Sequence, residues 1–172
     1  LEGLPRGFVP LFDPVRTVES YLKTAHPRAF VIALSLPEDE NGFCDAALGG
    51  WLPALARFRQ DIPGVVFCLL NRTTLGQNGS EPLPGELAPV RSLGFGFQDA
   101  VALAQRGNAF LGCLDSFGLA AIGAGCPGIY LDPVGGDRHD PGRLMWWFVN
   151  PSPEQCLAAL RVLIRQRGPA WI

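Results

Sequence analysis

The chain has 172 residues, of which 48% are hydrophobic and 17% are charged, so it is long enough and apolar enough to form one domain with a substantial core. The formal net charge is −2 and no basic stripe is visible, which argues against nucleic acid as a partner. No apolar run reaches the roughly 18 residues of a membrane span. No leader-like segment opens the sequence, and we therefore expect a cytoplasmic protein.

Five cysteines are present, an odd number at wide spacing and without a Cys-x-x-Cys pair. We interpret them as free, mostly buried thiols in a reducing compartment. The two histidines, His26 and His139, have no second ligand at metal spacing, so we predict no metal site and no cofactor. A catalytic or metal-binding role of His139 stays open as the alternative to a structural one.

Helix and strand signals alternate from the start of the chain. Asp13-Pro14 has the form of a helix cap followed by proline, which predicts a helix over residues 14–25. Nearly continuous apolar runs at 29–36 and 64–70 are typical of strands buried on both faces. Between these runs, apolar residues at helical spacing predict a helix over about 51–61.

The middle of the chain begins with residues 71–89, which are rich in Gly, Pro, Ser and Thr and which we predict to be a long loop. Short apolar runs bounded by glycine, proline or cap residues follow. They predict, in order, a strand at 90–93, a helix over 98–105, a strand at 108–114, a helix over about 117–124 and a strand at 128–132.

The last part of the chain begins with a Gly- and Asp-rich loop, predicted over 133–143. Residues 144–149 are apolar and form either a last strand or a buried extended segment. Ser152-Pro153-Glu154-Gln155 has the form of a capping box and begins a final helix that runs to about residue 166. The alternation predicts an α/β fold, a Rossmann-like parallel sheet with helices on both faces. We divide the chain into an N-terminal segment with one helix, 1–28, and a Rossmann-like domain, 29–172.

In open α/β sheets the ligand lies at the carboxyl ends of the strands, so the residues directly after each predicted strand are the candidates. They are Ser35 with the 37–42 loop, Asn71-Arg72-Thr73, Gly94 to Phe97, Asp115 to Gly118, and Asp132 to Gly136. The acidic run Glu38-Asp39-Glu40 could serve a metal or acid–base chemistry, but a solvated loop is the simpler interpretation. Trp146-Trp147 is interpreted as core or interface rather than as a sugar platform.

Asp115-Ser116-Phe117-Gly118 joins a buried strand directly to a helix and is the strongest candidate. Backbone N–H groups and the dipole at such a helix start favour a phosphate, Ser116 adds a hydroxyl, and Gly118 allows close approach. The alternative is that Asp115 or Ser116 is only a helix cap. Gly94-Phe95-Gly96 resembles the start of a Gly-x-Gly-x-x-Gly fingerprint, but Asp99 stands at the third glycine, so a plain turn is an equal alternative.

The stretch from Asp99 to Leu131, DAVALAQRGNAFLGCLDSFGLAAIGAGCPGIYL, resembles the C-terminal domain of GT-B glycosyltransferases, most of all the heptosyltransferase-like branch. In that family a strand, an Asp-Ser-Gly-like turn, a helix of small residues and Gly-x-Pro follow one another. The resemblance covers about residues 29–166. It implies half of a GT-B fold that binds a nucleotide-diphosphate sugar, with Asp115, Ser116 and Gly118 near the donor phosphates or sugar.

The resemblance further implies that Gly94 to Phe97 lie near the base. The predicted donor-binding set is Ser35, Arg72, Gly94, Gly96, Phe97, Asp115, Ser116 and Gly118. Transfer would be metal-independent and would need a missing N-terminal acceptor domain, or another protein partner, to which the catalytic base belongs. The acidic 38–40 run, and the lack of a basic residue in the loop after the first strand, favour an alternative, a non-catalytic binding or interaction domain with a degenerate donor site. A sugar-nucleotide enzyme of related fold, such as an epimerase, is a third interpretation.

Overall fold

The computed structural model describes residues 14–25, 27–36, 45–70, 87–89 and 96–167. Helices and strands alternate along these ranges, as the sequence predicts. The elements are α1 (Pro14–Ala25), β1 (Phe30–Ser35), α2 (Asp45–Asp61), β2 (Val65–Leu69), β3 (Leu87–Pro89), α3 (Phe97–Arg106), β4 (Ala109–Cys113), α4 (Ser116–Gly123), β5 (Gly128–Leu131), β6 (Arg138–Asp140), β7 (Met145–Phe148) and α5 (Pro153–Arg167).

The strands form one seven-stranded sheet in the order β3-β2-β1-β4-β5-β7-β6. All neighbours pair in parallel except β6, which runs antiparallel to β7 at one edge. The chain first builds outward from β1 to β3 and then returns to place β4 on the other side of β1. The strand order therefore reverses between β1 and β4, as in doubly wound nucleotide-binding folds.

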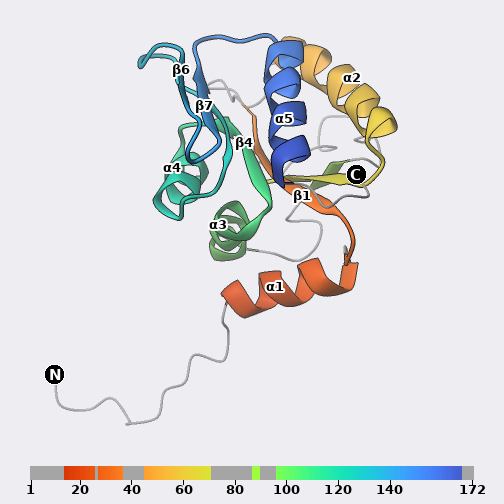
Figure 1. Cartoon of the computed structure of the whole chain (residues 1–172). Coiled ribbons are helices and arrows are strands. Elements are labelled where there is room, and N and C mark those ends of the chain that lie inside the picture. The colour runs from red at the N-terminus through yellow and green to blue at the C-terminus, as the bar shows by residue number, and fades with distance from the viewer. Residues whose placement is uncertain (1–13, 26, 37–44, 71–86, 90–95, 168–172) are drawn as a thin grey trace, which may run out of the picture.

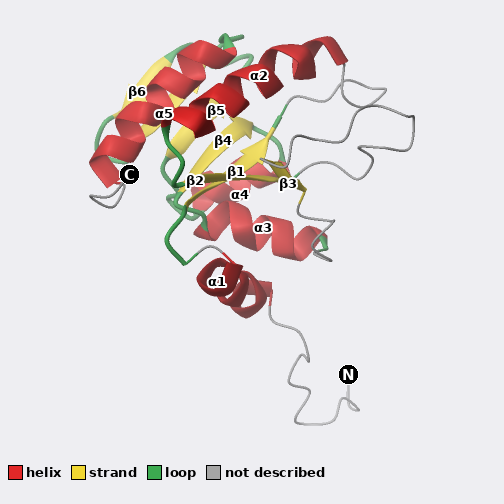
Figure 2. Ribbon diagram, turned by 90° about the vertical axis from the view of Figure 1, so that its right-hand side faces the viewer, coloured by secondary structure: helices red, strands yellow, loops and turns green. Residues whose placement is uncertain are grey.

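Helices cover both faces of the sheet (Figure 1). Helices α2 and α5 lie together on one face, and α3 and α4 lie together on the other, with α1 packed outside α3 (Figure 2). The predicted α/β fold, a Rossmann-like sheet with helices on both faces, is thereby confirmed. None of the helices in the described ranges is long and apolar enough to cross a membrane.

The core consists of two apolar layers, one on each face of the sheet, and the side chains of β1 alternate between them. Phe30, Ile32 and Leu34 enter the layer under α2 and α5, whereas Val31 and Ala33 enter the layer under α3 and α4. All six residues of β1 are buried because helices cover the strand on both sides. This is the physical reason for the unbroken apolar run from which the strand was predicted.

Three predicted boundaries differ from the structure. Strand β3 occupies 87–89 inside the predicted loop, while the predicted strand at 90–93 lies outside the described residues. Strand β6 lies inside the loop predicted at 133–143, because Arg-His-Asp has no apolar alternation and becomes a strand only by pairing with the apolar β7. Helix α2 begins at Asp45, earlier than predicted.

Candidate functional site

The ends of β1 and β4 meet where the strand order reverses. The two strands pair in parallel, so Ser35 at the end of β1 lies beside Gly112 of β4. Two residues beyond β4, Asp115 returns toward β1, and the Ser35 hydroxyl donates a hydrogen bond to Asp115 Oδ2 over 2.5 Å. Ser35 has no exposed surface. Its hydroxyl therefore holds Asp115 in place instead of facing solvent.

Asp115 is the N-cap of α4, which is the alternative that the sequence left open. Its Oδ1 accepts hydrogen bonds from the backbone N–H groups of Phe117 and Gly118, both over 2.9 Å. The chain's own carboxylate thus occupies the two N–H groups that the sequence analysis assigned to a phosphate. Ser116, on the exposed side of this turn, keeps its hydroxyl at the surface.

Two glycines make this turn possible by close approach of backbone. A Cβ at Gly112 would lie 1.9 Å from the carbonyl oxygen of Ser35, so only glycine lets β4 run this close to β1 here. A Cβ at Gly118 would lie 2.2 Å from the carbonyl oxygen of Cys113. Gly118 is therefore required where α4 turns back over the end of β4, a packing role distinct from the predicted approach of a ligand.

The start of α3 adjoins the start of α4. The rings of Phe97 and Phe117 contact each other, with centroids 5.4 Å apart. Helix α3 begins at Gly96, whose own N–H donates to Asp99 Oδ2 over 2.8 Å, and no side chain caps this helix start. Asp99 is buried at 3% exposure, and its Oδ1 has no hydrogen-bond partner. Two predicted segments, around Gly96 and around Asp115, thus form one contiguous cluster with Ser35.

A cavity of about 530 Å³ opens at the same edge of the sheet, on the side of α2 and α5. This volume lies in the range of small-molecule sites in proteins. Its polar wall contains Asp115, Asp132, Asn150 and the half-buried Cys113. Its apolar wall contains Trp51, Leu114, Leu131, Pro133 and Pro151. No lysine or arginine of the described ranges belongs to the wall.

Trp51 and Asn150 are cavity residues that the sequence analysis did not select. Trp51 comes from α2, and its side-chain direction depends on how that helix packs. Asn150 follows β7, so the rule on strand ends selects it once residues 144–149 are assigned as a strand. The sequence left open whether residues 144–149 form a strand, so Asn150 could not be selected as a residue at a strand end.

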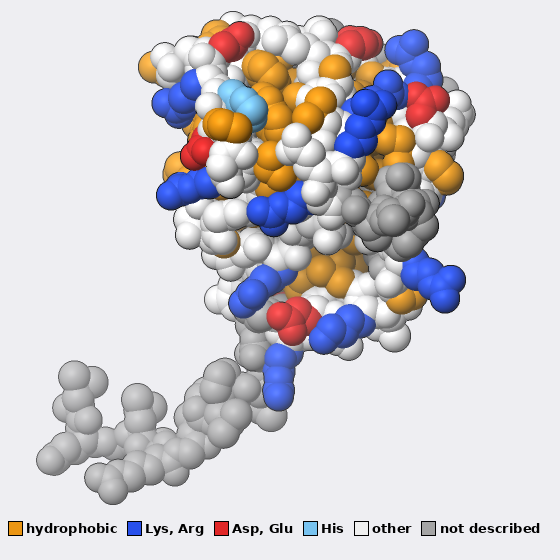
Figure 3. Space-filling view, viewed as in Figure 1, with side chains coloured by type: hydrophobic (Ala, Val, Ile, Leu, Met, Phe, Trp, Pro, Cys, Tyr) orange, Lys and Arg blue, Asp and Glu red, His pale blue; other side chains and the backbone are white. Residues whose placement is uncertain are grey.

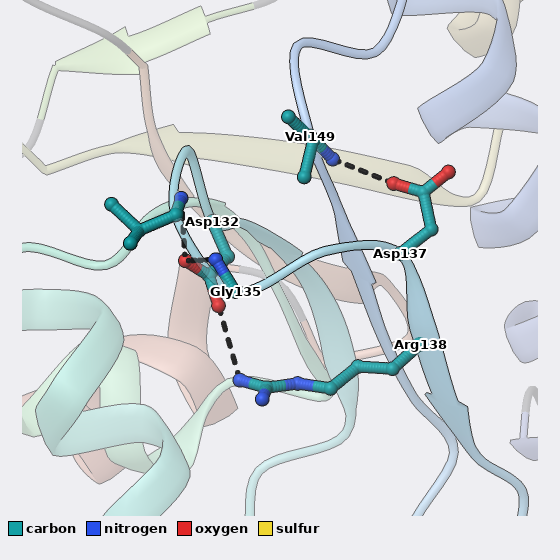
Figure 4. A network of polar contacts seen from close by, with 6 residues as sticks. Asp132, Gly135, Asp137, Arg138 and Val149 are labelled. Carbon is teal, nitrogen blue, oxygen red and sulfur yellow. Dashed lines mark hydrogen bonds and ion pairs between the residues drawn. The ribbon is translucent and has the colours of Figure 1, made fainter.

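Asp132, directly after β5, lines the cavity. Its carboxylate also binds the loop between β5 and β6 (Figure 4). Its Oδ1 accepts hydrogen bonds from the N–H groups of Val134 and Gly135, at 3.1 and 2.8 Å, and its Oδ2 pairs with Arg138 at 3.1 Å. The guanidinium group of Arg138 also stacks over Trp147, 4.8 Å from the ring centroid. Of the predicted candidate segment 132–136, Asp132 and Pro133 therefore belong to the cavity wall, and Asp132 fixes the turn that follows them.

Several predicted residues lie elsewhere. Arg72, Gly94, His26 and the 38–40 run are outside the described residues. His139 belongs to β6, where its ring stacks on Trp146 with centroids 4.4 Å apart, and it is not part of the cavity wall. Among the residues whose placement is described, no three His, Cys, Asp or Glu side chains gather in a way that could hold a metal ion.

The described cysteines differ sharply in surroundings. Burial raises the pKa of Cys68, Cys126 and Cys156 to about 12 in each case. These thiols remain protonated at neutral pH and are shielded from solvent. Cys113 lines the cavity and is only partly buried. The thiols of Cys68, Cys126 and Cys156 are free and buried, as the sequence predicts.

In Figure 3, basic side chains are spread over the face in view, with acidic and apolar side chains between them. This distribution differs from the continuous basic stripe that nucleic acid requires.

Compared with known proteins, the chain matches no family model and no curated sequence. No comparison tests the resemblance to GT-B glycosyltransferases, which stays a prediction from the sequence over residues 29–166. A Rossmann-like architecture by itself carries many unrelated activities, so the site and not the fold has to support a function.

Proposed function

We propose that the chain binds a nucleotide-diphosphate sugar at the carboxyl ends of its strands, as the donor-binding half of a glycosyltransferase. The observation that carries the proposal is the 530 Å³ cavity at the carboxyl ends of β4, β5 and β7, which reaches Asp115 next to the point where the strand order reverses. Open α/β sheets bind their ligands at this place. The sequence motifs that resemble GT-B enzymes, around Asp115 to Gly118, converge on the same place.

The arrangement of polar groups suggests how such a donor would lie. Asp115 occupies the N–H groups of Phe117 and Gly118 at the start of α4. At the start of α3, Asp99 takes only the N–H of Gly96, so we place the diphosphate at the other N–H groups of that helix start. Phe97, 57% exposed beside that helix start, offers a ring on which a base can stack. The sugar would then extend past Asp115 toward the cavity.

Catalysis by this half would consist of holding the donor and stabilising the leaving diphosphate. The proposed transfer is metal-independent, and the base that activates the acceptor belongs to an acceptor domain or a partner protein. The site residues of the described part are Ser35 and Asp115, which fix the turn, together with Ser116, Gly96 and Phe97 on its exposed side.

A second candidate function is a binding or interaction domain whose donor site is degenerate. Two observations favour it: the carboxylate of Asp115 stands where a phosphate was predicted, and the described cavity wall has no cation. Such a domain would keep the fold and the cavity but not bind nucleotides.

Calorimetric titration with UDP, ADP and GDP and with their sugar conjugates separates the two candidates. Binding of one nucleotide at micromolar to millimolar concentration supports the donor site, and no binding of any of them at millimolar concentration contradicts it. Ser116→Ala should weaken the binding about 3- to 10-fold, the usual effect of one lost hydrogen bond. Ser20→Ala on the exposed side of α1 is the matched control and should leave the affinity unchanged.

A further inference from the structure

The wall of the cavity carries negative charge and apolar surface. Asp115 and Asp132 are its charged residues, and the described part of the wall contributes no positive charge. Arg138 offsets the charge of Asp132, so the Asp115 carboxylate is the main source of negative charge in the wall. The apolar side chains of Leu114, Leu131 and Trp51 strengthen its repulsion of an anionic group. An uncharged ligand group is therefore favoured inside the cavity.

Neither carboxylate is free to adapt to a ligand. Both oxygens of Asp115 accept hydrogen bonds, from Ser35 and from the start of α4. Both oxygens of Asp132 do the same, from its own loop and from Arg138. Their remaining lone pairs can accept from hydroxyl groups, but neither side chain can turn away from a negative charge.

Asn150 is the neutral polar side chain of the wall, and no described residue hydrogen-bonds to its amide. Its backbone is left-handed, with φ 45°, although Pro151 follows and a residue before proline is largely restricted to extended conformations. The chain is fixed on both sides of it. The N–H of Val149 donates to Asp137 over 2.7 Å, and Ser152 Oγ accepts from Gln155 N at the start of α5. Such an over-determined conformation is typical of residues that are held for a ligand.

We propose that the cavity takes an uncharged, hydroxyl-bearing ring, the sugar of the nucleotide sugar, and that the Asn150 amide is a specificity-determining contact to its hydroxyl groups. This inference rests on the proposed function and adds the class of sugar. The ring lies against the apolar wall around Trp51 and Leu131, and its hydroxyls meet the amide and the carboxylate oxygens. Sugars that carry a carboxylate, such as uronic acids, are disfavoured by the negative charge of Asp115.

A matched pair of donors tests the charge argument without any variant. UDP-glucose and UDP-glucuronic acid share nucleotide and ring and differ in a CH₂OH or a carboxylate group at one carbon, and the equivalent pair is used if another nucleotide binds better. We expect the neutral sugar to bind about tenfold more tightly, because a negative charge in the cavity is repelled by the Asp115 carboxylate. Equal or tighter binding of the uronate overturns the inference.

Protection of the Cys113 thiol locates the sugar. Alkylation of Cys113, followed by peptide mass spectrometry, should slow at least about fivefold when nucleotide sugar is present and much less with the nucleoside diphosphate alone. Equal protection by the two ligands, or none by either, places the sugar outside the cavity and contradicts the inference.

Asn150→Gly tests the side-chain amide alone, because it removes the amide and keeps the backbone conformation. Glycine accepts the left-handed conformation without strain, so this variant should fold at least as stably as the parent chain. Its affinity for the nucleotide sugar should fall about 3- to 10-fold, the usual effect of one lost hydrogen bond, while its affinity for the nucleoside diphosphate stays unchanged. Leu144→Asn is the control. Leu144 is the other described non-glycine residue with positive φ, 55°, and it lies before the first residue of β7, at the end of that strand away from Asn150. This control should leave the affinity unchanged.

The outcomes distinguish the two proposals. If no nucleotide and no nucleotide sugar binds, the proposed function fails. If nucleotide sugars bind but Asn150→Gly has no effect on the contribution of the sugar, the proposed function stands and the assignment of the cavity to the sugar is wrong.

Discussion

The Ser35 hydroxyl and the Asp115 carboxylate lie 80 positions apart in the sequence and are joined by a hydrogen bond across β1 and β4. The bond links the ends of the two strands between which the strand order reverses. Because Asp115 also caps α4, one side chain ties together the end of β1, the end of β4 and a helix start. A fixed negative charge therefore stands beside the cavity, and its effect on a ligand can be measured.

Replacing Asp115 by Asn should remove the charge and keep the cap, since Asn caps helices as well as Asp does. We expect nucleoside diphosphates to bind about 3- to 10-fold more tightly to this variant in calorimetry, because the competing anion is gone. Asp115→Ala should in addition lower the free energy of unfolding by about 1–2 kcal/mol through loss of the cap. If Asp115→Asn binds nucleotide more weakly than the parent, the carboxylate contacts the ligand directly and our view of it as a competitor is wrong.

Two glycines of α4 offer a matched test of the close contact at its start. Gly118→Ala would bring a Cβ to 2.2 Å from the carbonyl oxygen of Cys113, so we expect a loss of about 1–3 kcal/mol in the free energy of unfolding. At Gly123, in the same helix, nothing lies within 4 Å of a Cβ. Gly123→Ala should therefore be neutral or stabilise by about 0.5 kcal/mol. Urea denaturation followed by circular dichroism measures both, and equal effects of the two substitutions would contradict the contact.

The buried strands and the residues at their ends were predictable because both follow from local pattern. Apolar runs mark strands covered on both faces, and the rule on strand ends selects Ser35 and Asp115 without knowledge of their contact. The hydrogen bond between them depends on which strands become neighbours. The periodicity of single elements does not contain that information.

The cavity was less predictable for the same reason. Trp51 enters it through the packing of α2 against the sheet, and Asn150 enters it because β7 pairs with β5. The assignment of Asp115 to a phosphate failed to anticipate that its own carboxylate would accept from Phe117 and Gly118. A cap and an anion site have the same sequence signature, and only the position of the side chain separates them.

Stability should fall at alkaline pH because three thiols are buried in their neutral form. The pKa of Cys68, Cys126 and Cys156 is raised from 9.0 to about 12 in the folded chain. Above pH 9 the unfolded chain loses these protons and the folded chain keeps them, so the free energy of unfolding decreases as pH rises and the loss continues until about pH 12. Each thiol contributes at most about 1.4 kcal/mol per pH unit in that window.

Urea denaturation at pH 7, 9 and 10 measures this effect. Cys68→Ala and Cys126→Ala should each reduce the slope between pH 9 and 10 by one thiol's share. A slope that is the same in both variants and in the parent would show that other groups cause the alkaline loss.

Asp132 and Asp140 form the same local motif at opposite ends of the hairpin that contains β6. Each accepts hydrogen bonds from the N–H groups two and three residues ahead, and each pairs with an arginine, Arg138 at 3.1 Å and Arg143 at 3.9 Å. They differ in burial and place. Asp132 is 7% exposed and lines the cavity, whereas Asp140 pairs with Met145 at the far end of β7.

Asp132→Ala should therefore destabilise the fold by about 1–2 kcal/mol, because the N–H groups of Val134 and Gly135 and the Arg138 guanidinium lose a buried acceptor. It should also weaken ligand binding, because the cavity wall at this turn is no longer held. Asp140→Ala, in a solvated turn, should cost less than about 1 kcal/mol and leave the affinity unchanged. Thermal unfolding and calorimetric titration of both variants check this. Loss of affinity in Asp140→Ala equal to that in Asp132→Ala would mean that the whole hairpin, and not the wall beside the cavity, controls the site.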